Sequence, residues 1–246
     1  MLPFAIAGKS PPVTAPALHG CFITATGTDV GKTFIARALA LALRARGQAV
    51  CAVKPMETGC DPAPKDAMLL AEACGRSELA SQPGFYRAVS PLAPLAAALT
   101  EGHPPPQVSN MTQACRECLR PGDYLLVEGA GGAQVPISEE TTTLDLMVAL
   151  ALPVMLVASD ELGTLSHTLC AYESLQRRQL QVAAVVVNRV TSVTSASQNS
   201  AASNLRILQQ RLPTTVLAFP RCEAAIAPAD LAATAQASGL LATLNV

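Results

Sequence analysis

The chain has 246 residues, of which 50% are hydrophobic, 14% are charged and 3% are aromatic, and its formal net charge is −1. This length and composition suit one large α/β domain and do not require a second. The balanced charge and the scarcity of aromatic rings argue against a nucleic-acid partner. The longest apolar run, residues 146–158, is interrupted by Pro153 and is shorter than the roughly 20 residues of a membrane span. We therefore expect neither nucleic acid nor a membrane as a partner.

The N-terminal segment and the cysteines indicate the cellular compartment in which we expect the protein. Residues 1–19 are rich in proline and lack the basic start of a secretory signal, so we expect a loosely ordered extension before a domain spanning residues 20–246. Eight cysteines are scattered through the chain, several inside apolar runs, which is typical of reduced thiols in a cytoplasmic protein. Cys115 and Cys118 have the spacing of a metal or redox pair. Two cysteines on a helix is the favoured interpretation, because no second pair follows at ligand distance.

The first predicted strand, residues 20–23, leads into the most informative loop of the chain. The loop ends in Gly31-Lys32-Thr33 and precedes an apolar helix that should end before position 47. This order is that of a phosphate-binding P-loop, in which Lys32 would contact the β- and γ-phosphates and Thr33 would ligate Mg2+. The strict pattern has glycine where Thr26 stands, so the loop is a variant. An ordinary strand–turn–helix with a solvated lysine is the weaker alternative.

A second apolar strand, residues 49–53, ends at Lys54. The C-terminal ends of buried parallel strands are where open α/β sheets bind ligands, so Lys54 is a candidate site residue rather than a solvated lysine. Pro55 should end the strand, and a loop should follow it. Asp66 opens a helix of about nine residues, where it is either an N-cap or an acid directed at a metal.

A third apolar strand, residues 124–127, ends in Glu128 and a glycine-rich turn through position 132. In P-loop proteins a second acidic residue after such a strand holds Mg2+. The glycines of this turn allow backbone N–H groups to approach phosphates closely. The alternative is a tight turn with a capping glutamate.

The next segments alternate between helix and strand: a helix at 144–150, a strand at 154–158, a helix ending near Gln176 and a strand at 182–187. Thr164 and Ser166 stand where they could cap the second of these helices, and its free N–H groups could hold a carboxylate.

Asn188 ends the most hydrophobic strand, and its amide could contact an adenine edge. Residues 191–203 are rich in serine, alanine and asparagine and predict a flexible loop. A helix at 205–212, a strand at 216–219 and a helix from about position 228 complete the chain. The predicted fold is a single-domain α/β structure of the P-loop NTPase type, with a mostly parallel sheet and helices on both faces.

Taken in this order, the motifs resemble those of the dethiobiotin synthetase family over residues 22–188. The specific part is the pairing of a Lys-Pro-x-x-Thr-Gly motif with a Val-Glu-Gly-Ala-Gly-Gly motif. The resemblance is carried by Thr28-Asp29-Val30-Gly31-Lys32-Thr33, Lys54-Pro55-Met56-Glu57-Thr58-Gly59, Asp66-Ala67, Val127-Glu128-Gly129-Ala130-Gly131-Gly132, Leu162-Gly163 and Asn188.

The resemblance implies a ligase that converts 7,8-diaminopelargonate, CO2 and ATP into dethiobiotin, ADP and phosphate. One amine becomes a carbamate, whose oxygen attacks the γ-phosphate, and the other amine then displaces phosphate. The resemblance also implies a homodimer, in which the segment matching 163–166 of one subunit reaches the substrate carboxylate of the other.

The resemblance further implies roles for individual residues. Lys32 and Lys54 would be catalytic, through charge stabilisation. Mg2+ would be held by Thr33, Asp66 and Glu128. The substrate would contact Thr28, Thr58, Gly163, Thr164 and Ser166. ATP would contact Asp29, Val30, Gly31, Lys32, Thr33, Phe34, Asp66, Glu128, Gly129, Ala130, Gly131 and Asn188.

The chain also departs from the family pattern. It has Ala25 where the family usually has glycine, Gly27 where it has aspartate, and Asp29 where glutamate is common. Ser166 stands where asparagine is frequent. These departures concern the detailed geometry of the phosphate loop and the contact with the substrate carboxylate.

Three other functions remain compatible with a P-loop. A partition- or septum-positioning ATPase would have an additional lysine early in the loop, whereas Lys32 is the only lysine between positions 22 and 33. A related amide-forming ligase acting on a large cofactor precursor is usually longer. A non-catalytic relative would retain the fold but would show no diamine-dependent release of ADP.

Overall fold

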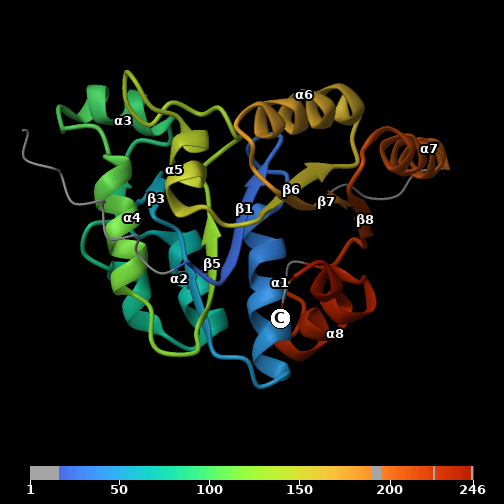
Figure 1. Ribbon diagram of the computed structural model, residues 1–246, viewed down its shortest axis with the longest axis horizontal. Coiled ribbons are helices and arrows are strands. Elements are labelled where there is room, and N and C mark those ends of the chain that lie inside the picture. The colour runs from blue at the N-terminus through green and yellow to red at the C-terminus, as the bar shows by residue number, and fades with distance from the viewer. Residues whose placement is uncertain (1–16, 190–194, 224, 245) are drawn as a thin grey trace, which may run out of the picture.

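The computed structural model describes residues 17–189, 195–223, 225–244 and 246, which form an α/β fold around a parallel sheet (Figure 1). The sheet has six strands in the order β2-β5-β1-β6-β7-β8, and every neighbouring pair is parallel. The predicted fold class is therefore confirmed. The strands are β1 (Gly20–Ala25), β2 (Val50–Val53), β5 (Tyr124–Glu128), β6 (Val154–Ser159), β7 (Val182–Asn188) and β8 (Thr215–Phe219).

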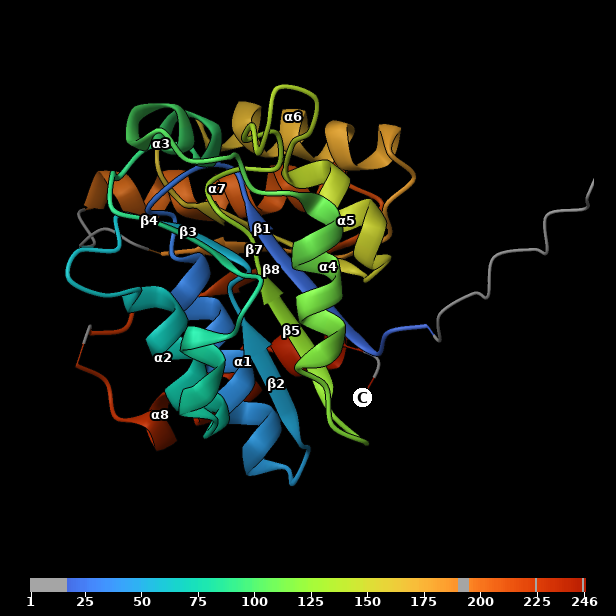
Figure 2. The ribbon, with the colours of Figure 1, turned by 90° about the vertical axis from the view of Figure 1, so that its left-hand side faces the viewer.

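Helices cover both faces of this sheet (Figure 2). One face carries α1 (Lys32–Ala45), α2 (Lys65–Cys74) and α8 (Pro228–Ala237). The other carries α4 (Val108–Glu117), α5 (Thr143–Leu150), α6 (Thr164–Arg177) and α7 (Ser195–Arg211). Two short 3-10 helices follow α2 and α8, at Ser77–Ser81 and Leu240–Thr243. Within the described part of the chain, no helix is long and apolar enough to cross a membrane.

A second, two-stranded sheet lies beyond the end of β2. It pairs β3 (Met56–Thr58) with β4 (Tyr86–Ala88) in parallel, and α3 (Pro94–Glu101) packs against both strands. The sequence predicted only a loop after Pro55. The three-residue strand was missed because its partner lies about thirty residues further along the chain and leaves no local pattern.

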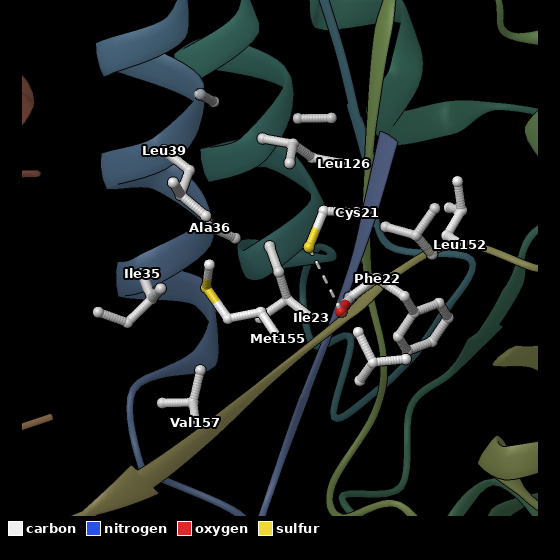
Figure 3. Close-up of a cluster of buried hydrophobic side chains, with 14 of the residues drawn as sticks. Cys21, Phe22, Ile23, Ile35, Ala36, Leu39, Leu126, Leu152, Met155 and Val157 are labelled. Atoms are coloured by element: carbon white, nitrogen blue, oxygen red, sulfur yellow. Dashed lines mark hydrogen bonds between the residues drawn. The ribbon is translucent and has the colours of Figure 1, made fainter. Parts of the chain in front are cut away.

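Side chains from α1 and the central strands form the core beneath the P-loop (Figure 3). Cys21 and Ile23 face α1, whereas Phe22 between them points to the other side of the sheet, as the two-residue period of a strand requires. Ile23 and Ile35 are completely buried, and burial of a side chain of this size contributes about 1.5–3 kcal/mol. This packing fixes the start of α1 relative to the end of β1.

The predicted loop at 191–203 is wrong from Ser195 onward, because α7 begins there. Leu208 of α7 and Leu212, directly after its end, are buried, and the helix packs against β8 and α6. A helix that is packed at one point extends cooperatively through neighbouring residues of moderate helix propensity. The polar composition of this segment therefore did not prevent helix formation. Residues 190–194, and positions 1–16 of the expected N-terminal extension, lie outside the described residues.

Candidate active site

The order of the strands brings three predicted motifs to one edge of the sheet. Strand β5 lies between β1 and β2, and its register places Glu128 opposite Ile23 and Val127 opposite Val53. Neighbouring strands are about 4.8 Å apart, so the segments that leave their C-terminal ends are within side-chain reach of each other. These segments are the P-loop after β1, Lys54 after β2 and Glu128 at the end of β5.

The P-loop has the backbone conformation of an anion-binding turn. Asp29 and Gly31 have φ angles of 59° and 91°, in the left-handed region. Left-handed residues in a tight loop direct N–H groups into a concavity, and Gly31 begins α1 without a side-chain cap, which leaves its first N–H groups available. Lys32 Nζ donates to the Gly27 carbonyl at 2.9 Å. Burial lowers the pKa of Lys32 to about 8.

Lys54 links two acids at the centre of the site. Its ammonium donates to Asp66 and, at 2.7 Å, to Oε1 of Glu128. The same Oε1 accepts a hydrogen bond from the Thr33 hydroxyl at 2.8 Å. Burial by itself would lower the pKa of Lys54, but the charges of Glu128 and Asp66 outweigh it and raise that pKa above its ordinary value. Lys54 is therefore a cation held at the junction of all three motifs.

The predicted Mg2+ ligands form a donor set that suits this ion. Oε2 of Glu128 is buried without a hydrogen-bond partner, so it has unused capacity to bind a cation. The Asp66 carboxylate is 38% exposed, and the Thr33 hydroxyl lies beside Glu128. In the described part of the chain, no cluster of three or more His, Cys, Asp or Glu side chains has metal-binding geometry. Mg2+ fits such a site, because it is usually held by one or two carboxylates together with substrate phosphates and water.

Two residues that the sequence did not single out hold this arrangement in place. Glu57 is buried, and its two carboxylate oxygens accept hydrogen bonds from the N–H groups of Asp66 and Ala67, each at 2.9 Å. It thus caps α2 from outside the helix, so Asp66 is free of the N-cap role and its carboxylate pairs with Lys54. Arg87 of β4 donates to the Lys54 carbonyl at 3.0 Å and fixes the turn after β2.

These groups surround a cavity of about 720 Å3. Twelve of the predicted site residues line it: Thr28, Asp29, Gly31, Lys32, Thr33, Phe34, Lys54, Thr58, Asp66, Glu128, Ala130 and Gly131. The sequence did not identify the other lining residues, which are Arg37, Glu57, Leu69, Pro91, Leu92, Ala93, Pro94 and Val135. The position of Arg37, one helical turn after Thr33, was a signal that could have been used.

Three of the residues predicted to contact the nucleotide lie outside the cavity lining: Val30, Gly129 and Asn188. The Asn188 amide is buried and donates to the Val30 carbonyl at 2.9 Å, so one of its donors supports the P-loop backbone. A Cβ atom at Gly129 would lie 3.0 Å from the Phe22 ring and 3.2 Å from Thr143 Cγ2. Glycine at 129 thus permits close packing, and the adenine contact of Asn188 remains a prediction.

The segment predicted to hold the substrate carboxylate is also outside the cavity of this chain. Gly163 begins α6 with a φ of 94°, and no side chain caps the helix, so the capping expected from Thr164 and Ser166 is wrong. Thr164 is buried and its hydroxyl lies 3.5 Å from that of Thr168. Gly163 and Ser166 are exposed, together with the fully exposed Leu162.

The cysteine pair with metal-like spacing is helical at its first member, as expected. Cys115 is fully buried in α4, and Cys118 follows the end of that helix and is also buried. All eight cysteines are free thiols.

Comparison with known proteins identifies relatives of this chain. A family model described as an AAA domain matches residues 19–223. An "ATP-dependent dethiobiotin synthetase BioD" of Caulobacter vibrioides is 44% identical over 209 residues, which cover 83% of this chain and 93% of that protein. A protein of the same name from Anaeromyxobacter dehalogenans is 39% identical over 201 residues, with coverage of 81% and 90%.

Among solved structures, chloroplast FtsY from Physcomitrella patens is similar with a TM-score of 0.51 and 13% identity, covering 93% of this chain and 69% of that one. This likeness concerns the fold alone. The sequence relatives, together with the lysine and acid motifs assembled at the ends of β1, β2 and β5, show that the chain belongs to the ATP-dependent dethiobiotin synthetase family.

Proposed function

We propose that the protein converts 7,8-diaminopelargonate, CO2 and ATP into dethiobiotin, ADP and phosphate, a step of biotin biosynthesis. Family membership supports the reaction. The structural observation that carries the residue assignments is the position of Lys54. It is a buried cation at the junction of the P-loop, Asp66 and Glu128, on the wall of a cavity large enough for nucleotide and diamine.

In the proposed sequence, one substrate amine adds to CO2, loses a proton and becomes a carbamate. A carbamate oxygen attacks the γ-phosphorus of ATP, and the bond to ADP breaks. The second amine then attacks the carbonyl carbon of the mixed anhydride and expels phosphate, which closes the cyclic urea. Negative charge gathers on the carbamate and the transferred phosphoryl group in the first transfer. Lys32 and Lys54 stabilise this charge, as expected where catalysis depends on positioning and electrostatics.

Thr33, Asp66 and Glu128 would hold Mg2+, which neutralises phosphate charge when it is bound. Four acidic and three basic side chains line the cavity, which leaves an excess of negative charge. A bound divalent cation would make the net charge of the cavity positive, which suits the site for a phosphate chain. These charged residues are Asp29, Glu57, Asp66, Glu128, Lys32, Arg37 and Lys54.

The diamine would lie on the side of the cavity formed by Thr28 and Thr58, with its carbon chain against the apolar residues there. Those residues are Leu69, Pro91, Leu92, Ala93, Pro94 and Val135. We assign the substrate carboxylate to residues 163–166 of a second subunit in a homodimer. The exposure of Gly163, Ser166 and Leu162 supports this assignment, because a partner can reach them.

Incubation with 13C-bicarbonate, Mg-ATP and 7,8-diaminopelargonate tests the proposal. We expect dethiobiotin with one labelled carbon, detected by mass spectrometry, and one ADP formed per product molecule. The matched control replaces the diamine by 7-amino- or 8-aminopelargonate, each of which has one amine and cannot close the ring. The absence of labelled dethiobiotin from the complete mixture would contradict the proposal.

A further inference from the structure

Arg37 is a cavity-lining cation that neither the motifs nor the reaction described above uses. It lies on α1, and three basic side chains line the cavity: Lys32, Arg37 and Lys54. Two of them have partners within the protein, because Lys32 donates to the Gly27 carbonyl and Lys54 to two carboxylates. Arg37 differs from both.

In the described part of the chain, Arg37 has no partner. Its Nε is buried without a hydrogen-bond acceptor, and no described carboxylate forms an ion pair with the guanidinium. A buried donor without an acceptor is unfavourable, so arginine at this position is costly for the protein alone. A guanidinium that borders a cavity and lacks an internal partner is suited to an anionic ligand.

The geometry of α1 directs Arg37 toward the phosphate end of the cavity. Side chains on a helix lean toward its N-terminus, and residues three and four positions apart share a face. We therefore expect the Arg37 side chain to lean toward the turn that holds Thr33 and Phe34. Both of these residues line the same cavity, and Thr33 is bonded to Glu128.

We propose that Arg37 binds the phosphate chain of the nucleotide, adding a planar, bidentate donor to the P-loop and the two lysines. The inference rests on the proposed use of ATP. It assigns Arg37 to nucleotide affinity rather than to ring closure, since Lys54 already occupies the junction of the catalytic motifs. Arg37 thus contributes to the preference of the site for polyphosphate ligands.

Calorimetric titration of Arg37→Gln with ATP, ADP and inorganic tripolyphosphate, without diamine, tests this role. We expect each affinity to fall by about tenfold to a hundredfold, the usual effect of losing a charge-assisted hydrogen bond. Arg37→Lys keeps the charge but not the fork, so we expect a smaller loss. Arg46→Gln is the matched control, because Arg46 is exposed at the other end of α1, and its affinities should equal those of the parent protein.

Unchanged affinities in Arg37→Gln would overturn the proposal. So would a loss for ATP without a loss for tripolyphosphate, because the contact would then be with the nucleoside. A larger loss in Arg37→Lys than in Arg37→Gln would also overturn it, because the retained charge would then oppose binding of the phosphate chain. The parent protein could form no dethiobiotin while Arg37→Gln still weakens tripolyphosphate binding. That result would leave Arg37 assigned to the phosphate chain and would reject the proposed reaction instead.

Discussion

Replacing Lys54 by methionine removes a buried ammonium and keeps an unbranched side chain of similar length. Lys54 is 6% exposed and Glu128 is 1% exposed, so their pairing takes place away from water. After the substitution Glu128 keeps only the Thr33 hydroxyl on Oε1, and Oε2 still has no partner. Asp66 is partly exposed and can be hydrated, so the energetic cost falls mainly on Glu128.

The expected cost is about 3–5 kcal/mol, the usual effect of leaving one member of a buried ion pair without its partner. This corresponds to roughly two to three and a half orders of magnitude in the unfolding constant. Urea unfolding followed by circular dichroism measures it. Adding Glu128→Gln to Lys54→Met removes the unpaired charge, so the double variant should be more stable than Lys54→Met alone. Lys65→Met, a change at an exposed lysine, is the control and should shift stability by less than about 0.5 kcal/mol.

Under conditions where Lys54→Met is folded, it should still bind ATP but form dethiobiotin at least about 100-fold more slowly, as when one charge-stabilising donor is removed. Two results would refute this reasoning. Parental stability of Lys54→Met would mean that the pair with Glu128 is not desolvated. Parental turnover would mean that Lys54 does not act on the reacting groups.

Two further variants test the supporting contacts. Glu57→Ala removes the cap of α2 and should lower the free energy of unfolding by about 1–2 kcal/mol. Because Asp66 then loses its fixed position, turnover should need a higher Mg2+ concentration. An unchanged dependence of turnover on Mg2+ would contradict this. Asp145 forms a capping box with Thr142 at the start of α5. Partial burial would raise the pKa of Asp145, but hydrogen bonds from Thr142 and Arg178 outweigh it and lower that pKa. The stabilisation is therefore present at neutral pH and lost as the pH falls through the folded-state pKa. Asp145→Ala should be about 1 kcal/mol less stable near pH 7 and equal to the parent protein in acid, and a deficit that is constant from pH 7 to 3 would show that ionisation of Asp145 is not its source.

The main site residues were predictable because their signal is local. Strands buried on both faces are apolar runs, and a charged residue at the end of such a run is conspicuous, as at Lys54 and Glu128. The P-loop is likewise a contiguous pattern. Asp66 left two interpretations open. The structure excludes the capping role, because Glu57 caps α2 and the Asp66 carboxylate pairs with Lys54, and the metal role stays a prediction.

The remaining features depend on packing between distant segments. Glu57 lies in a quoted motif, but its role arises only when α2 folds back onto β3. The position of Arg37 one helical turn after Thr33 was a signal, but only the cavity beside Arg37 separates it from a solvated residue of an amphipathic helix. Asn188 was correctly placed at a strand end, but its bond to the Val30 carbonyl could not be seen in the sequence.

The most direct test of the central claim is phosphate release from Mg-ATP in the presence of bicarbonate, measured with and without 7,8-diaminopelargonate. The proposed mechanism predicts release that depends strongly on the diamine, because the carbamate of that diamine is the nucleophile. Release at the same rate without the diamine would contradict the mechanism and indicate an ATPase switch. ATP binding with no release under either condition would contradict it as well and indicate a non-catalytic relative.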